Sequence, residues 1–159
     1  MKLPNWIRRP LEDWAYRVTM SRVADFILED GERAYLYRWH IIPPNPVLSL
    51  YVHLFAGPDF GRHLHDHRSA SLSLVLDGWY EEIWATPQMC MAGGDGVVAR
   101  VEKGDVVYRP ARNAHMVTRT AGAVTIFITG PTWRRWGFWV NREWVDYKTY
   151  FEQQQSGPK

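Results

Sequence analysis

The sequence predicts a single all-β domain, an antiparallel sandwich or barrel, that follows one amphipathic helix. A chain of 159 residues has room for one domain with a hydrophobic core and little room for a second. From Arg33 onward, alternating segments rich in β-branched and aromatic residues are separated by Pro and Gly, as in antiparallel sheets. Before that point, apolar residues recur mostly at three- and four-residue intervals, which is typical of one helix face.

The predicted helix covers residues 13–29, and Gly31 follows it as a stop signal. We expect this helix to pack on the outside of the β domain. The chain then divides into a helical lead-in (1–32), a β domain (33–152) and a disordered tail (153–159).

Nine segments of the β domain are predicted strands. They cover residues 34–41, 47–55, 69–76, 80–85, 97–101, 105–108, 115–120, 124–129 and 138–140. Short turns such as Asp77-Gly78 favour antiparallel pairing. The Gly-rich stretch 89–96 is expected to be a loop between two strands.

Composition narrows the classes of partner. The formal net charge of +2 comes without a continuous basic stripe, which disfavours nucleic-acid binding. Cys90 is the single cysteine, so it has no internal disulfide partner, and no apolar run reaches the length of a membrane span or signal peptide. We therefore expect a cytoplasmic protein with a small-molecule substrate and neither nucleic-acid nor membrane partners.

Three histidines predict a metal site. In an extended strand, alternate side chains share a face, so His65 and His67 can contact one ion, and His115 can complete the set from a second strand. Further residues of the same parity as His65 are polar, namely His63, Ser69, Ser71 and Ser73. The opposite face carries Leu72, Leu74 and Leu76. One face is therefore a wet pocket lining, and the other packs against a second sheet or a covering element.

The histidines lie in two motifs that resemble those of the cupin superfamily. The first motif has His-x-His, then Glu, then Gly, and these places are held by His65, His67, Ser71 and Gly78. The second has two Gly, a Pro and a His, and these places are held by Gly104, Pro110, Arg112 and His115. The resemblance implies a single cupin jelly-roll barrel with one divalent metal ion bound by the three histidines.

A three-histidine cupin with His-Asp-His in its first motif is similar to the thiol dioxygenases, among them cysteine dioxygenase. The resemblance implies an iron(II) site that activates dioxygen; zinc, manganese or nickel remain open from the ligands alone. Because Ser71 replaces the usual carboxylate, the ion would keep its full charge and favour an anionic chelating substrate. Thr125, Phe127 and Thr129 replace the Ser, His and Tyr that this family carries on a late strand, which disfavours cysteine itself as the substrate.

Other side chains are candidates for the pocket. Arg68 and Arg109 are predicted to bind a substrate carboxylate, with His63 at the pocket rim. Ser71 and Tyr108 are predicted to assist proton movement. Weaker candidates are Arg62, Tyr80, Glu82 and Arg119.

We therefore expect a metal-dependent oxidoreductase of the dioxygenase type. Two alternatives stay open: a non-oxidative metal-dependent isomerase or lyase, and a cupin module that binds a ligand without catalysis.

The Trp-rich segment 130–140 interleaves three Trp and a Phe with two Arg. A single-strand nucleic-acid platform has this composition, and so does a segment that packs over the domain or against a second subunit. Without net positive charge elsewhere, packing is favoured. The nine Trp, eight Tyr and six Phe exceed what a core of this size needs, so a homodimer is a further expectation.

Overall fold

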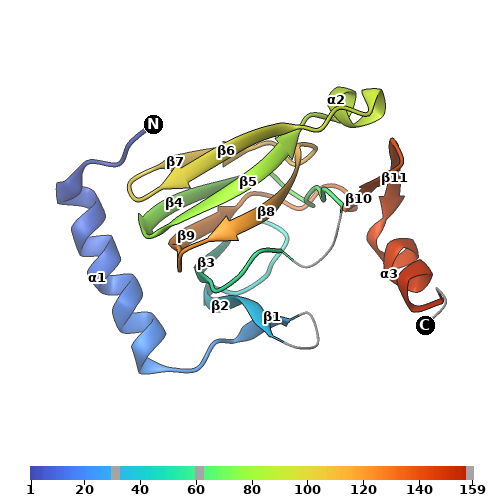
Figure 1. Ribbon diagram of the computed structural model, residues 1–159. Coiled ribbons are helices and arrows are strands. Elements are labelled where there is room, and N and C mark those ends of the chain that lie inside the picture. Colours follow the sequence, from blue (N-terminus) through green and yellow to red (C-terminus); the bar gives the residue numbers. More distant parts are fainter. Residues whose placement is uncertain (30–32, 60–62, 157–159) are drawn as a thin grey trace.

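The computed structural model describes residues 1–29, 33–59 and 63–156 (Figure 1). Its helices are α1 (Asn5–Ser21), α2 (Pro87–Ala92) and α3 (Tyr147–Ser156). Its strands are β1 (Phe26–Glu29), β2 (Ala34–Ile42), β3 (Ser49–Phe55), β4 (Ser71–Asp77), β5 (Trp79–Ala85), β6 (Val97–Glu102), β7 (Val106–Arg109), β8 (Ala114–Thr120), β9 (Val124–Thr129), β10 (Gly137–Val140) and β11 (Glu143–Asp146).

Two antiparallel sheets form the body of the molecule. The larger has the order β1-β2-β3-β9-β4-β7 and the smaller the order β6-β5-β8. Val75 of β4 packs in one buried cluster with Tyr80 of β5 and Val117 of β8, so the two sheets meet face to face. The predicted all-β jelly roll with an N-terminal helix is confirmed.

Alternation along β4 separates an inner face from an outer face. Ser71, Ser73 and Val75 point inward and are buried. Leu74 and Leu76 point outward, where the apolar side of α1 covers them. The polar row therefore lies between the sheets, and helix α1 is the covering element, along the outer face of the larger sheet (Figure 1).

The helix differs from its predicted bounds at both ends. It begins at Asn5 rather than near residue 13 and continues through Pro10. It ends at Ser21, and Phe26–Glu29 forms the edge strand β1 that pairs with β2. Asp25 explains this change of direction, because its carboxylate pairs with Arg22 and accepts the backbone N–H of His40 at 2.7 Å. Gly31, the predicted stop signal, lies outside the described residues, as does the boundary at 32 between lead-in and β domain.

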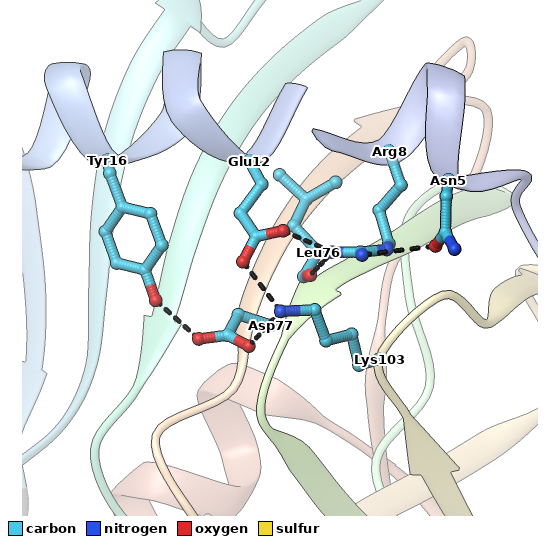
Figure 2. Close-up of polar contacts among 7 residues, drawn as sticks. All are labelled: Asn5, Arg8, Glu12, Tyr16, Leu76, Asp77 and Lys103. Atoms are coloured by element: carbon cyan, nitrogen blue, oxygen red, sulfur yellow. Dashed lines mark hydrogen bonds and ion pairs between the residues drawn. The ribbon is translucent and has the colours of Figure 1, made fainter. Parts of the chain in front are cut away.

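Polar contacts join α1 to the end of β4 and to Lys103, as Figure 2 shows. Arg8 is buried and donates to the backbone oxygen of Leu76 at 3.2 Å. The Lys103 ammonium lies 2.7 Å from both a Glu12 oxygen and an Asp77 oxygen, and the Tyr16 hydroxyl donates to Asp77 at 2.6 Å. These contacts fix the helix although Pro10 removes one of its backbone hydrogen bonds.

We expect the Tyr16–Asp77 hydrogen bond to give α1 a pH-dependent share of its stability. This bond, followed by burial, raises the pKa of Tyr16 to about 12 from an ordinary value of 10.0. Because the pKa of Tyr16 is higher in the folded state than in the unfolded state, the hydrogen bond contributes its full free energy of stabilisation below pH 10. This contribution is lost as the pH rises toward 12. Since the ring is 39% exposed, screening limits the effect to about 1 kcal/mol or less.

Denaturant unfolding at pH 8 and at pH 11 tests this expectation. Tyr16→Phe should be less stable than the unsubstituted protein at pH 8, and the difference should shrink at pH 11. Tyr108→Phe is a matched control, because Tyr108 is 67% exposed on the outer face of β7. A difference that is equal at both pH values would contradict the assigned role of the hydroxyl.

Two predicted irregular segments contain helix. Residues 87–92, which overlap the predicted loop, form α2, where Thr86 accepts the Met89 N–H and Gly93 adopts the left-handed conformation that ends the helix. Residues 153–156 of the predicted tail continue α3, and residues 157–159 lie outside the described part. Among the described helices, none is both long enough and apolar enough to cross a membrane.

Candidate metal centre

His65 and His67 lie in an extended segment that precedes β4. The backbone of His65 exchanges two hydrogen bonds with His115 of β8, at 3.0 and 2.9 Å. The His67 N–H donates to the Ala111 oxygen at 3.0 Å, which joins this segment to the residues just before β8. This pairing puts both histidines on one side of the segment and Asp66 on the other.

The three predicted ligands come together. One ring nitrogen from each of His65, His67 and His115 lies within 4.8 Å of the other two, and the ring centroids are 4.9–5.2 Å apart. Among the described residues, these three histidines form the one group of His, Cys, Asp or Glu side chains whose spacing suits a metal ion. That the group binds an ion stays a prediction, and its geometry fits one.

Glu82 fixes the proton of His115. Its carboxylate is 3% exposed and lies 3.0 Å from the Nδ1 atom of that ring. A carboxylate accepts hydrogen bonds, so Nδ1 carries the proton and Nε2 keeps a free lone pair. Arg109, 6% exposed, donates to both Glu82 oxygens and holds the carboxylate in place. Hydrogen bonds of this kind orient histidine ligands in metal sites.

All three imidazoles are favoured in the neutral form that binds metals. Burial is the largest cause and lowers the pKa of each ring, strongly for His67 and His115. The two Nε2 atoms of His67 and His115 are 2.8 Å apart. Because the His115 lone pair faces His67, this contact is either a hydrogen bond donated by a His67 Nε2–H or the approach of two ligand atoms to one cation. Neighbouring nitrogen ligands of a divalent ion, each about 2.1 Å from it, stand at comparable separations.

Asp66 faces away from the cluster and anchors the C-terminal strap, residues 133–151. It is 1% exposed and accepts the Gly137 N–H at 2.8 Å and the Trp144 indole N–H at 2.9 Å. The Arg134 guanidinium lies 2.7 Å from the same carboxylate. Gly137 is required by its close approach to β11, because a Cβ atom there would lie 2.1 Å from the Val145 oxygen.

The strap places aromatic rings against the cluster. Phe138 and Trp136 lie 5.9 and 6.4 Å from the His65 ring, measured between centroids. Tyr150 of α3 stacks on Phe138 at 3.8 Å. The Trp-rich segment therefore packs over the domain, which is one of the two packing arrangements that the sequence suggested. A second subunit on its outer side stays a prediction.

The remaining predicted site residues lie in different places. Ser71 is 4% exposed on the inner face, directly opposite Arg109. Tyr108 pairs with Leu72 on the outer face, so its predicted role in proton movement is not supported by its position. Arg68 is exposed. His63 is outside the cluster, with its Nδ1 atom 3.0 Å from the Tyr150 hydroxyl. Arg62 lies outside the described residues.

Arg109 has a partner that the sequence did not indicate. We predicted that it binds substrate, but its guanidinium is engaged with the buried Glu82. It therefore supports His115 through that carboxylate. Arg109 was a candidate because a guanidinium can bind a carboxylate through two hydrogen bonds, and that property does not indicate which carboxylate it meets across the sheets.

Sequence reasoning missed Arg38 and Asp59. Arg38 of β2 is half-buried on the inner face and donates from Nε to His53 Nε2 at 2.9 Å. The strand register puts Arg38 directly opposite His53, on the same face of the sheet. The charge of Arg38 contributes to the lowered pKa of His67. The charge of the Asp59 carboxylate raises the pKa of His65, against the effect of burial. This carboxylate also accepts the Val117 N–H at 2.8 Å. The sequence held one signal for Arg38: it alternates with Leu36 and His40 along β2, so these three side chains share one face of the strand.

Comparisons with known proteins support the fold. No protein-family model and no curated protein matches the sequence. Among solved structures, the Clostridium difficile EutQ protein matches with a TM-score of 0.50 and 16% identity over 69% of this chain and 80% of that one. A protein from Ralstonia eutropha JMP134, named as a candidate mannose-6-phosphate isomerase, matches with a TM-score of 0.51 and 13% identity over 68% and 94%. Iron(II) HppE in complex with substrate matches with a TM-score of 0.50 and 14% identity over 65% of this chain and 54% of that one. At these identities the likeness establishes the architecture alone.

Proposed function

We propose that this chain, which has the cupin fold, is a metal-dependent enzyme in which His65, His67 and His115 hold one divalent ion, with iron(II) favoured. The observation that carries the proposal is the convergence of three imidazoles inside the sheets, one of them fixed in its metal-binding tautomer by Glu82. The reaction is a dioxygenation of a small anionic chelating substrate.

The choice of ion rests on the donor set. Three imidazole nitrogens suit iron, zinc, manganese or nickel, and the resemblance to thiol dioxygenases favours iron(II). Iron(II) HppE, which shares the fold, is a solved iron-bound example of the same architecture. When bound, such an ion supplies dioxygen activation and holds the substrate and dioxygen next to each other.

The charge balance indicates an anionic substrate. Three neutral ligands do not compensate the ion's charge, and the nearby Glu82 carboxylate is already paired with Arg109. The Asp59 carboxylate contributes one negative charge near His65. Arg38 adds a second positive charge on the inner face, and no carboxylate from the described residues forms an ion pair with it. Its guanidinium is the group that we assign to the substrate's anionic end, in place of Arg68 and Arg109. Ser71, buried on the same face, remains the candidate hydroxyl for proton movement.

The proposed reaction consumes substrate and dioxygen in equal amounts. Both oxygen atoms enter the product, and the substrate supplies all four electrons that reduce dioxygen, so no external reductant is required. With a thiol, for example, the sulfur is oxidised to a sulfinic acid and both oxygen atoms bond to it.

Oxygen-electrode assays of iron-loaded protein test this function. The panel is a small thiol acid, a diketone and a hydroxy acid, with His67→Ala protein as the control. We expect uptake of dioxygen equal to substrate loss, and both atoms of ¹⁸O₂ in the product. Substrate conversion without oxygen uptake would replace the proposal with an isomerase or lyase, the class suggested by the name of the Ralstonia eutropha neighbour. Binding without any product would identify a ligand-binding module.

The proposed enzyme is a cytoplasmic homodimer that acts on a small molecule. Sedimentation of the purified protein measures its oligomeric state directly.

A further inference from the structure

We infer that His53 is a positioning residue, which orients the Arg38 guanidinium so that the proposed substrate is held through a carboxylate. This inference rests on the proposed function and deepens it. It concerns the row of residues that β2, β3 and β9 place side by side on the inner face. The strand register puts Arg38 opposite His53, and His53 opposite Thr125.

His53 is held rigidly where it meets Arg38. The side chain is 3% exposed. Its ring lies 4.8 Å from the Phe127 ring and 5.8 Å from the Tyr51 ring, with interplanar angles of 24° and 12°. A ring fixed between two aromatic neighbours presents its nitrogen in one direction only.

The contact with Arg38 determines the tautomer of His53. The Arg38 Nε–H can only donate, so the His53 Nε2 atom at 2.9 Å must carry the lone pair and Nδ1 the proton. A protonated ring would place a second positive charge against the guanidinium. Burial, followed by the charge of Arg38, lowers the pKa of His53 well below its ordinary value, in agreement with the neutral form.

This hydrogen bond decides which edge of Arg38 remains available. With Nε engaged, the two terminal NH₂ groups stay together at the far end of the guanidinium, and the Tyr51 ring lies beneath it at 4.9 Å. Two parallel N–H donors match the two oxygens of a carboxylate. The substrate class is therefore a short carboxylic acid whose second group, such as a thiolate or hydroxyl, reaches the metal.

Thr125 supplies an additional polar group in the same row. Its hydroxyl is fully buried and has no hydrogen-bond partner within the described part of the chain. A buried hydroxyl without a partner costs free energy, which a ligand or an ordered water recovers. It lies directly opposite His53 in the strand register, on the same inner face.

Three variants separate the hydrogen bond from the packing of the ring. His53→Phe keeps a ring between Tyr51 and Phe127 and removes the acceptor, whereas His53→Gln keeps an acceptor. Arg38→Gln removes the charge. Thioglycolate and ethanethiol are the probes, since both offer a thiolate and only the first has a carboxylate. Binding is measured anaerobically by calorimetry on iron-loaded protein, together with metal content.

We expect the unsubstituted protein to bind thioglycolate more tightly than ethanethiol. His53→Phe should weaken thioglycolate about tenfold, as expected for a lost hydrogen bond to a charged group, and leave ethanethiol unchanged. His53→Gln should recover most of the loss. Arg38→Gln should remove the preference for thioglycolate.

Several results would overturn the inference. Unchanged thioglycolate affinity in His53→Phe, or an equal loss for both probes, would mean that His53 is structural. Failure of metal-loaded protein to bind thioglycolate would remove the subsite while leaving the metal site intact. If the protein holds no metal, the proposed function fails, and the His53–Arg38 pair is then examined by NMR. The Arg38 Nε–H should exchange slowly in the unsubstituted protein and rapidly in His53→Phe, and equal exchange would exclude the positioning role.

Discussion

Replacing His67 with Ala is expected to reduce bound divalent metal from about one ion per chain to nearly none. Three histidines provide the described ligand set, and removal of one leaves two imidazoles that no longer surround an ion. The central contact of the cluster, the 2.8 Å separation of the His67 and His115 Nε2 atoms, disappears with that ring. Elemental analysis of protein purified without added metal measures the loss.

Two further variants make this experiment specific. His63→Ala removes a nearby imidazole that contacts Tyr150 instead of the cluster, so its metal content should stay unchanged. Glu82→Gln should lower metal affinity by about 10- to 100-fold, because the group that orients His115 loses its charge. Circular dichroism shows whether each variant is folded. Full metal content in folded His67→Ala would remove the basis for the proposed function.

Replacing Asp66 with Ala is expected to destabilise the protein by about 3 kcal/mol and to release the strap from the domain. The carboxylate is 1% exposed and accepts hydrogen bonds from a backbone N–H and an indole N–H, beside its ion pair with Arg134. Removal leaves the Trp144 N–H without its acceptor and the Arg134 charge partly buried and unpaired. Denaturant unfolding measures the free energy, and trypsin cleavage after Arg134 measures release of the strap.

Arg135→Ala is the matched control for this second prediction. The Arg135 side chain is 81% exposed and lies 3.7 Å from Asp146, so its removal should change the free energy of unfolding by about 0.5 kcal/mol or less. Equal stability of Asp66→Ala and Arg135→Ala would show that the strap is held by its aromatic contacts rather than by Asp66. Because Phe138 and Trp136 face His65, release of the strap should also expose one side of the cluster.

Strand alternation predicted much of the site because it is a local property. His65 and His67 share a face in any extended backbone, and the same parity placed Ser71 and Ser73 in the interior. The same rule applied to β7 shows why Tyr108 and Arg109 differ: adjacent residues in a strand point to opposite faces, so only one of them can meet the site. Assigning both to the pocket overlooked that alternation.

Pairing between distant segments decided the rest. The predicted helix extended to residue 29 because the helical spacing of apolar residues continued that far. In the structure, residues 26–29 instead pair with β2 and form an edge strand. Arg38 and His53 met because β2 pairs with β3, and Glu82 met His115 because β5 pairs with β8, in registers that a linear pattern does not contain.

By itself, the sequence determined the fold class, the outer covering helix and the three histidines that gather at one point, because these follow from periodicity and motif spacing along the chain. Only the tertiary structure decided the residues that fix the tautomer of His115, the arginine that faces the interior, and the strap that Asp66 anchors over His65. Those assignments depend on which side chains meet across sheets, and such contacts are set by the packing of the whole chain.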